Sequence, residues 1–344
     1  SEHLVELHQT LRRRMRQSPV MDEGLYMAEL EEAYLRAWQT YTGESAAAEE
    51  LSAQECARRG VSYLQEAGET NQQRAVYWLR RALAGDVENC VEIAGFLAEA
   101  CHDQLDYQGE YEAAWQAVAA LAANRHPVSR EFRRALYIRA ANAALTMGDY
   151  SRAMNAFRQS EAYSDSLAER NSSFGSLLLA AHYTEMDSQQ LFDLHRPYGE
   201  LFASVKPFQH LLPGHQHRKL RIGYLSPDFR QHVMFAFYYG LLCCYDHSIF
   251  EVTGYQLNAE TDGFTESLRQ QTDFWRDLSG LTWEEAACRI ATDEIDILVD
   301  LAGHSANTGL PILAWKPAPV QISGLGYMAT TALTAVDYFL TDPI

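Results

Sequence analysis

The stretch IDILVDLAGHS, residues 295–305, decides how the C-terminal part of the chain folds. It is a short apolar run that ends in a glycine and two polar side chains, the pattern of a buried strand followed by a turn. Because strands that alternate with helices form parallel sheets with helices on both faces, we expect an α/β lobe over residues 220–344. The other strand-like runs are LRIGYLS (220–226), EVTGYQL (251–257), FWRDLS (274–279), APVQISGLG (318–326) and DYFLTD (337–342), and helix-like stretches lie at 233–245, 263–272, 282–292 and 307–315.

The first 200 residues have a different pattern, with apolar residues at positions i, i+3, i+4 and i+7 and almost no strand-like alternation. This periodicity predicts an all-helical region over residues 1–200. Residues 201–219, which contain Pro213 and Gly214, are expected to connect this region to the α/β lobe. The expected helices cover 2–16, 23–41, 45–66, 70–83, 87–103, 109–123, 129–147 and 150–163.

A repeat is visible within the helical region. Glycine, tyrosine and alanine recur with a period of 39 in residues 109–114 and 148–153, and one more step back leads to Ala75. We expect the glycine to turn the chain, the tyrosine to pack on the preceding helix, and the alanine to let two helices approach closely. The spacing resembles a tetratricopeptide (TPR) repeat, in which helix pairs stack into a solenoid because one pair cannot bury its apolar face alone. A generic helical bundle with a chance period is the alternative.

The composition limits the classes of partner. Apolar residues make up 47% of the chain and charged residues 22%, as in packed globular proteins. The formal net charge is −18, and residues 220–344 hold six Lys and Arg against sixteen Asp and Glu. Because nucleic acid requires a basic face, we expect no nucleic-acid partner. The sequence has neither a signal peptide nor an apolar run of about 18 residues, so we expect a soluble, cytoplasmic chain without a membrane partner.

The sequence lacks the common nucleotide-binding motifs Walker A and GxGxxG, the zinc-binding motif HExxH and the nucleophile motif GxSxG. His210, His215 and His217 in the connector could suggest a metal cluster, but a solvated loop is the preferred interpretation. The six cysteines show no CxxC spacing, so we expect them to be reduced. No metal site is therefore predicted.

Polar residues that follow the predicted strands are the candidates for a site, since ligands of an open parallel sheet bind beyond the carboxyl ends of its strands. After the strand at 220–226, Asp228 can cap a turn, and His232 lies at or just before a helix N-terminus. The positive end of that helix favours a neutral imidazole, which suits a base or a hydrogen-bond partner. The alternative for His232 is a helix-terminal residue without a role.

Two further groups follow later strands. His304 and Ser305 come after the most apolar strand, behind a glycine that lets a ligand approach the backbone. Leu325, Gly326 and Tyr327 follow the strand within 318–326, again with a glycine. Each group alone could be an ordinary strand-to-helix turn. Their common position at strand ends favours a ligand site.

These motifs carry a resemblance. The stretches KLRIGYLSPDFRQH (219–232), IDILVDLAGHS (295–305), KPAPVQISGLGY (316–327) and DYFLTD (337–342) resemble, in order and spacing, the N-terminal catalytic lobe of the O-linked N-acetylglucosamine transferase and SPINDLY family. The resemblance covers about residues 180–344. It implies a TPR-like all-helical solenoid followed by a Rossmann-like parallel-sheet lobe, which is the N-terminal half of a two-lobed GT-B fold.

The resemblance also implies an activity, namely an inverting, metal-independent protein O-glycosyltransferase without a cofactor. Such an enzyme moves N-acetylglucosamine or a related sugar from a UDP-sugar to Ser or Thr hydroxyls of a protein acceptor held in the helical groove. His232 matches the family's histidine beside the sugar and diphosphate and is the predicted catalytic residue. A further histidine, in the junction between the helical and the catalytic part, has been considered as a base in such enzymes. His182 or His195 could occupy that region, and their roles stay open. The residues expected to bind donor or substrate are Asp228, His304, Ser305, Leu325, Gly326 and Tyr327.

The sequence departs from the family in two respects. Val233, Gly324 and the pair Met328–Ala329 replace the family's usual residues, which leaves the transferred sugar open. The family continues into a second lobe with most nucleotide contacts, whereas this sequence stops at Ile344. We therefore expect the 344-residue chain alone to bind a UDP-sugar weakly and to be inactive. The alternative function is a non-catalytic, TPR-type adaptor with a remnant glycosyltransferase lobe.

Overall fold

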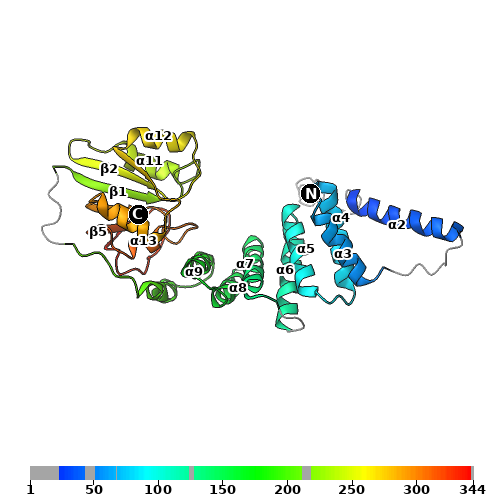
Figure 1. Ribbon diagram of the computed structural model, residues 1–344. Coiled ribbons are helices and arrows are strands. Elements are labelled where there is room, and N and C mark those ends of the chain that lie inside the picture. Colours follow the sequence, from blue (N-terminus) through cyan, green and yellow to red (C-terminus); the bar gives the residue numbers. More distant parts are fainter. Residues whose placement is uncertain (1–22, 43–50, 67, 124–127, 211–217, 342–344) are drawn as a thin grey trace, which may run out of the picture. The chain divides into compact units, whose positions relative to one another are not determined.

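The computed structural model describes residues 23–42, 51–66, 68–123, 128–210 and 218–341 (Figure 1). Contacts divide the chain into two compact units, Ser1–Tyr163 and Ser164–Ile344, which are treated separately below. The helix predicted at 2–16, the start of the one predicted at 45–66, and the connector histidines His215 and His217 lie outside the described residues.

The first unit is helical throughout its described residues, as predicted. Neighbouring helices pack in pairs, α3 with α4, α5 with α6 and α7 with α8, and α2 packs on α4. Ser52, Asp106, Ser129 and Asp149 cap four of the helices by accepting a backbone N–H three residues ahead, which satisfies a group that the first turn leaves unpaired. The helices are α2 (Glu23–Thr42), α3 (Ala53–Leu64), α4 (Glu69–Ala84), α5 (Cys90–Asp103), α6 (Tyr107–Ala122), α7 (Arg130–Thr146) and α8 (Tyr150–Ala162).

The repeat is only partly reflected in the structure. Ala75, Ala114 and Ala153 are all buried, on the second helix of each pair, as expected of small residues at a close helix contact. Gly148 has a φ of +76° and turns the chain before α8, whereas Gly109 lies inside α6. The predicted turn at Gly109 is therefore wrong. Glycine is needed there because a Cβ would lie 2.2 Å from the Oδ2 of the capping Asp106.

The second unit begins with helices that the sequence assigned to the helical region. They are α9 (Leu167–Ala181), α10 (Ser188–His195) and the 3₁₀ helix η2 (Arg196–Phe202). Tyr198 and Phe202 of η2 belong to the same core cluster as the sheet, and Leu167 and Phe174 of α9 pack against it. The compact unit that carries the sheet thus starts at Ser164, well before the predicted lobe boundary at Leu220.

The sheet has six parallel strands among the described residues, in the order β3-β2-β1-β4-β5-β6. All six strands lie where the sequence predicted them, which confirms the Rossmann-like lobe. The chain moves outward from β1 to β3 and then returns to the other side of β1 with β4, so the strand order reverses between β1 and β4. The strands are β1 (Leu220–Ser226), β2 (Phe250–Gln256), β3 (Phe274–Asp277), β4 (Ile297–Asp300), β5 (Val320–Gly324) and β6 (Tyr338–Leu340).

Helices cover both faces of the sheet (Figure 1). On one face Tyr224, Val252 and Val299 pack with α11 (Phe235–Cys243) and α12 (Gly263–Gln271). On the other face Leu225, Tyr255 and Leu298 pack with α13 (Trp283–Thr292), α14 (Leu310–Leu313) and η2. Adjacent strand residues point to opposite faces, so apolar pairs such as 224–225 and 298–299 bury one side chain in each core.

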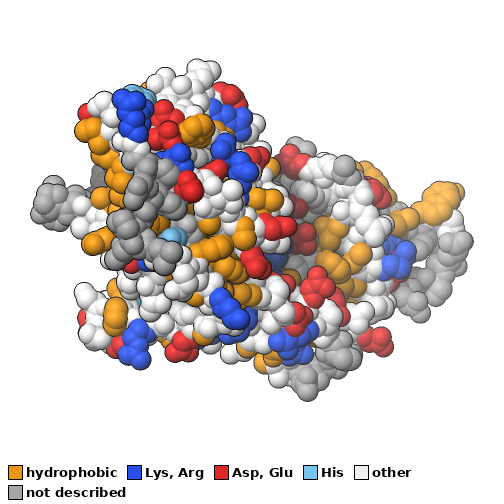
Figure 2. Space-filling view, turned by 60° about the vertical axis from the view of Figure 1, so that its left-hand side comes forward, with side chains coloured by type: hydrophobic (Ala, Val, Ile, Leu, Met, Phe, Trp, Pro, Cys, Tyr) orange, Lys and Arg blue, Asp and Glu red, His pale blue; other side chains and the backbone are white. Residues whose placement is uncertain are grey.

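Charged side chains of both signs are interspersed over the face shown in Figure 2, and the basic ones do not merge into one continuous surface there. Among the described residues, no helix has the length and apolar character needed to cross a membrane. All six cysteines are free.

Ala114 provides a test of the helix packing in the first unit. Ala114→Leu should lower the free energy of unfolding by about 1–3 kcal/mol, because the added atoms do not fit a fully packed contact. The same change at the exposed Ala119 of the same helix is the control and should be nearly neutral. Urea unfolding followed by circular dichroism measures both. Equal stabilities of the two variants would contradict close packing at Ala114.

Candidate functional site

The candidate site lies at the carboxyl ends of the parallel strands, near the reversal of strand order. The loops that follow β1 and β4 start side by side there, because Leu225 of β1 is paired with Asp300 of β4. Helices α9 and α10 and the loop after β5 complete the surroundings of the loop after β4. This is the edge at which open parallel sheets bind their ligands.

Asp300, the last residue of β4, fixes the loop that carries His304. Its carboxyl group is fully buried and accepts hydrogen bonds from the backbone N–H of Ala302 (3.3 Å) and of Gly303 (2.8 Å) and from the Ser323 hydroxyl (2.7 Å). Burial raises the pKa of Asp300, while these three donors oppose the rise. The loops after β4 and β5 are thereby tied to one buried group.

Two glycines let these loops meet each other, whereas the sequence predicted that they let a ligand approach the backbone. Gly303 has a φ of +57°, and a Cβ there would lie 2.3 Å from the Cβ of Tyr327. A Cβ on Gly326 would lie 2.2 Å from the carbonyl oxygen of Leu301. Their role is contact between the two loops, which places Tyr327 next to His304 with ring centroids 5.1 Å apart.

Tyr327 joins two histidines that come from α10 and from the end of α9. His195 Nδ1 lies 2.6 Å from the carbonyl oxygen of Leu191, which can only accept, so this nitrogen carries the hydrogen. In the neutral ring Nε2 then accepts the Tyr327 hydroxyl at 2.7 Å. Since that hydroxyl has one hydrogen, its oxygen must accept from His182 Nε2, 2.9 Å away. The lone pair of His182 is consequently on Nδ1.

Burial keeps these histidines neutral near pH 7. It lowers the pKa of His182, with a smaller effect from His195, and it also lowers the pKa of His195, opposed by the hydrogen bond to Leu191. The pKa of Tyr327 is raised by burial, so its hydroxyl stays protonated. The three groups therefore form an ordered chain of neutral hydrogen bonds, with one basic nitrogen at its end.

His304 is buried, like His195. Burial, with smaller effects from its neighbours, lowers its pKa to about 3. Its Nε2 lies 3.1 Å from the carbonyl oxygen of Thr331 and therefore carries the hydrogen. The other nitrogen, Nδ1, is a buried acceptor without a hydrogen-bond partner among the described residues, and the same holds for the hydroxyl of Ser305.

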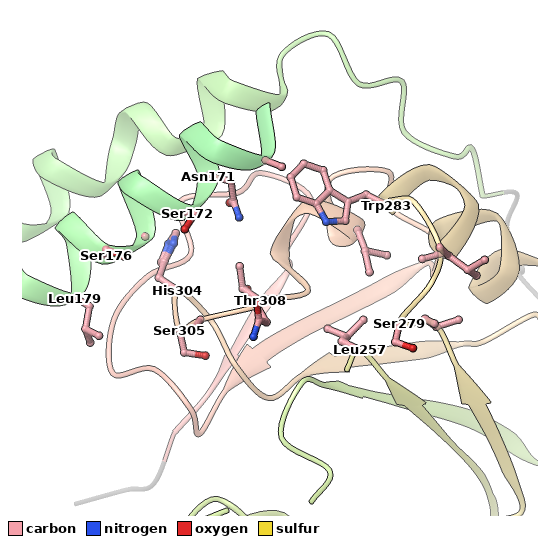
Figure 3. A pocket seen from close by; sticks show the side chains of 18 residues that line it. Asn171, Ser172, Ser176, Leu179, Leu257, Ser279, Trp283, His304, Ser305 and Thr308 are labelled. Carbon is pink, nitrogen blue, oxygen red and sulfur yellow. The ribbon is translucent and has the colours of Figure 1, made fainter. Parts of the chain in front are cut away.

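Beside His304 lies a pocket of about 420 Å³ (Figure 3). Asn171, Ser172 and Ser176 of α9 lie on one side, and His304, Ser305 and Thr308 of the loop after β4 lie opposite. The remaining lining residues are Ala168, Gly175, Leu179, Leu257, Leu278, Ser279, Leu281, Trp283, Ala286, Ala306, Asn307 and Ile312.

Asp228 and His232 lie elsewhere, in the loop between β1 and α11, and neither lines this pocket. Their nearest side-chain atoms, Oδ2 and Nδ1, are 3.8 Å apart. Burial raises the pKa of Asp228, while His232 and Arg230 counteract this rise. Helix α11 begins at Phe235, whose N–H donates to the carbonyl oxygen of His232, so His232 precedes the helix N-terminus as predicted.

Leu325, the last of the predicted residues, occupies the turn after β5 with a φ of +70° and is partly exposed. The structure thus brings His304, Ser305, Gly326 and Tyr327 together, with Leu325 beside them in the chain. Among the described residues, no group of three or more His, Cys, Asp or Glu side chains could hold a metal ion.

Comparisons with known proteins give matches over the part of the chain that carries these loops. Residues 203–344 match the model of glycosyl transferase family 41. The probable UDP-N-acetylglucosamine--peptide N-acetylglucosaminyltransferase SPINDLY of Arabidopsis thaliana is 34% identical over 183 residues, which cover 51% of this chain and 20% of the relative. The corresponding Caenorhabditis elegans transferase is 35% identical over 130 residues, or 37% of this chain and 11% of the relative. Over these residues the chain is similar to the O-linked N-acetylglucosamine transferase and SPINDLY family.

A solved structure extends the likeness to the helices. A mutant of the Thermobaculum terrenum O-GlcNAc transferase superposes with a TM-score of 0.60 at 25% identity, over 83% of this chain and 53% of that one. The chain spans about a fifth of the length of the SPINDLY relatives and about half of the solved transferase. The resemblance to this family, expected from the four motifs, is confirmed, and the adaptor alternative is not favoured.

The family motifs did not reveal the contribution of α9 and η2. Asn171 and Tyr198, which share a hydrogen bond of 2.6 Å, were missed, and His182 and His195 were noticed without a placement. The signal was present in the small polar residues Ser172, Gly175 and Ser176, which lie at helical spacing and leave room for a pocket.

Tyr327→Phe tests the hydrogen-bond chain. Loss of the hydroxyl leaves the buried Nε2 of His195 without a donor, so the free energy of unfolding should fall by about 1–3 kcal/mol. Tyr338→Phe, at an exposed position of β6, is the matched control and should change little. Urea unfolding is the measurement. A Tyr327→Phe variant as stable as the control would show that the hydroxyl does not bridge the two rings.

The buried histidines should make stability depend on pH. The pKa of His304 is near 6.5 in the unfolded chain and about 3 in the folded one, so between these values only the unfolded chain binds the proton. The free energy of unfolding should therefore decrease as pH falls from about 7 to 5, by at most ~1.4 kcal/mol per pH unit for this residue. His304→Gln should flatten the dependence, whereas His247→Gln, at an exposed position, should not. Equal slopes in both variants would contradict a buried neutral His304.

Proposed function

We propose that this chain is part of an enzyme that transfers N-acetylglucosamine from a UDP-sugar to a Ser or Thr hydroxyl of a protein acceptor. One observation carries the proposal: within the segment that matches the family, Tyr327 and His304 lie against His182 and His195 at the carboxyl ends of the strands. The printed names of the relatives, peptide N-acetylglucosaminyltransferases, supply the donor and the class of acceptor. Cytoplasmic location and an acceptor in the helical groove belong to the same proposal.

The proposed reaction is an in-line displacement with inversion at the anomeric carbon and without a metal ion. The acceptor oxygen forms a bond to that carbon, while the bond from the carbon to the diphosphate oxygen breaks and UDP leaves with the electron pair. The acceptor proton must pass to a base. The lone pair on His182 Nδ1 can accept it, since Tyr327 and His195 hold the other side of the ring.

The departing diphosphate needs hydrogen-bond donors where negative charge develops. His232 is the proposed donor in this chain. It precedes the N-terminus of α11 and its ring is partly exposed, so it can reach a ligand at the strand ends. The Met234 backbone N–H donates to Nδ1 of His232 at 3.4 Å and orients the ring, so in the neutral imidazole Nε2 is the nitrogen that can donate.

His232→Ala tests this role in the complete protein. Turnover should fall about 100-fold or more if the imidazole acts on the reacting groups. The melting temperature should barely change, because the side chain is partly exposed and packs little. Sugar transfer to an acceptor protein is followed by mass spectrometry, with and without EDTA, and His247→Ala is the control.

Near wild-type transfer by a folded His232→Ala variant would remove His232 from the chemistry. Loss of both transfer and folding would make it a structural residue. If transfer by the unmodified enzyme stopped in EDTA and returned with a divalent ion, metal independence would be refuted.

A further inference from the structure

The pocket between α9 and the loop after β4 has no charged residue among those that line it. His304 is neutral near pH 7, and every other polar lining residue is an amide, a hydroxyl or the indole of Trp283. A charged group placed there would lose water without gaining an opposite charge, which is unfavourable. The pocket therefore suits an uncharged ligand.

The hydrogen-bonding groups of the pocket are fixed in direction. His304 Nδ1 is a buried lone pair that needs a donor, because Nε2 already donates to Thr331. The Oδ1 of Asn171 accepts from the Tyr198 hydroxyl at 2.6 Å, so its Nδ2 is the end left to donate, and Figure 3 shows this nitrogen directed into the pocket. The Ser305 hydroxyl has no partner among the described residues and can do either.

One acceptor and one donor in the same small space match the N–H and C=O of a secondary amide. A phosphate or carboxylate oxygen offers no hydrogen to His304 Nδ1 and would be repelled by its lone pair. Two unpartnered polar atoms in a native structure also indicate a ligand, since a buried polar group without a hydrogen-bond partner destabilises the fold.

The position of the pocket distinguishes acceptor from donor. Five of the residues expected at the donor or its cleft do not line it, namely Asp228, His232, Leu325, Gly326 and Tyr327, whereas His304 and Ser305, expected to bind donor or substrate, do. One wall is instead α9, which belongs to the helices that precede the sheet. A volume of about 420 Å³ accommodates a side chain with its adjoining peptide groups.

We propose that this pocket binds an uncharged residue of the acceptor polypeptide through a backbone amide, and that it discriminates against acidic and basic residues at that position. The inference rests on the proposed transfer to a protein acceptor. It adds a binding site and a charge preference to that reaction. Trp283 and Leu257 supply the apolar contacts for the side chain, while His304, Ser305 and Asn171 bind the amide.

Capped tripeptides test the proposal directly on the 344-residue chain. The probes are acetyl-Ala-Thr-Ala-amide, its Asp counterpart and free N-acetylglucosamine, and binding is measured by NMR titration. The Thr peptide should bind at least about 10-fold more tightly than the Asp peptide. Ser305→Ala should weaken its binding about 2- to 13-fold, the effect of one lost neutral hydrogen bond.

Ser176→Phe should fill the pocket from the surface of α9 and weaken binding of the Thr peptide more than about 10-fold, because the ring occupies the ligand's space. Ser188→Phe, an exposed position at the start of α10, is the matched control. Similar binding of the Thr and Asp peptides, no peptide binding, or unchanged binding by Ser176→Phe would each overturn the proposal. Binding of N-acetylglucosamine in place of the peptide would overturn it as well and assign the pocket to a sugar.

The outcomes separate this inference from the proposed function. If peptides bind as expected and the complete protein shows no transfer, the pocket stands and the proposed reaction fails. If the complete protein transfers the sugar and Ser176→Phe leaves the KM for an acceptor peptide unchanged, the reaction stands and the pocket proposal fails.

Discussion

The buried carboxyl group of Asp300 is the interaction on which the candidate site depends. It stands at the end of β4, next to β1 on one side and opposite Ser323 of β5 on the other. By accepting two backbone N–H groups and the Ser323 hydroxyl, it forces the chain to turn immediately after the strand and ties that turn to the neighbouring strand. A buried carboxyl group is costly unless its oxygens are paired, so the three bonds and the turn geometry depend on one another.

The neutral state of the histidines follows from that geometry. The turn gives Gly303 its positive φ and brings it against Tyr327, and the hydroxyl of Tyr327 then reaches both His182 and His195. Packing excludes water from these rings, which lowers each histidine's pKa and fixes which nitrogen holds the hydrogen. The backbone carbonyl of Leu191 sets the direction of both hydrogen bonds of Tyr327, the one to His195 and the one from His182.

Much of the lobe could be predicted from the sequence, because short apolar runs ending in glycine and polar residues report strands and their carboxyl ends directly. His304, Ser305, Gly326 and Tyr327 were found in this way. The partners on α9, α10 and η2 could not be found, since His182 and His195 lie 145 and 132 residues from Tyr327 and no local pattern tells which helix face covers the sheet. The same limit applies to the unit boundary at Ser164, which depends on contacts of Tyr198 and Phe202 with the sheet core. At Gly109 the sequence predicted a turn, and the structure has a helix. A glycine that makes room for a close side-chain contact cannot be told in the sequence from one that makes a turn.

The distribution of charge distinguishes two parts of the candidate site, the pocket beside His304 and the loop after β1 that carries His232. No charged residue lines the pocket beside His304, so that region can orient hydroxyl and amide groups, but it cannot offset the charge of a diphosphate. The net charge of −18 also gives no general attraction for an anionic donor. Negative charge that develops on a leaving group must therefore be met outside the pocket, by oriented donors such as a histidine before a helix N-terminus. Within this chain that condition points to the loop after β1, where His232 lies, and it explains why the two predicted histidines can occupy separate places at the same edge of the sheet.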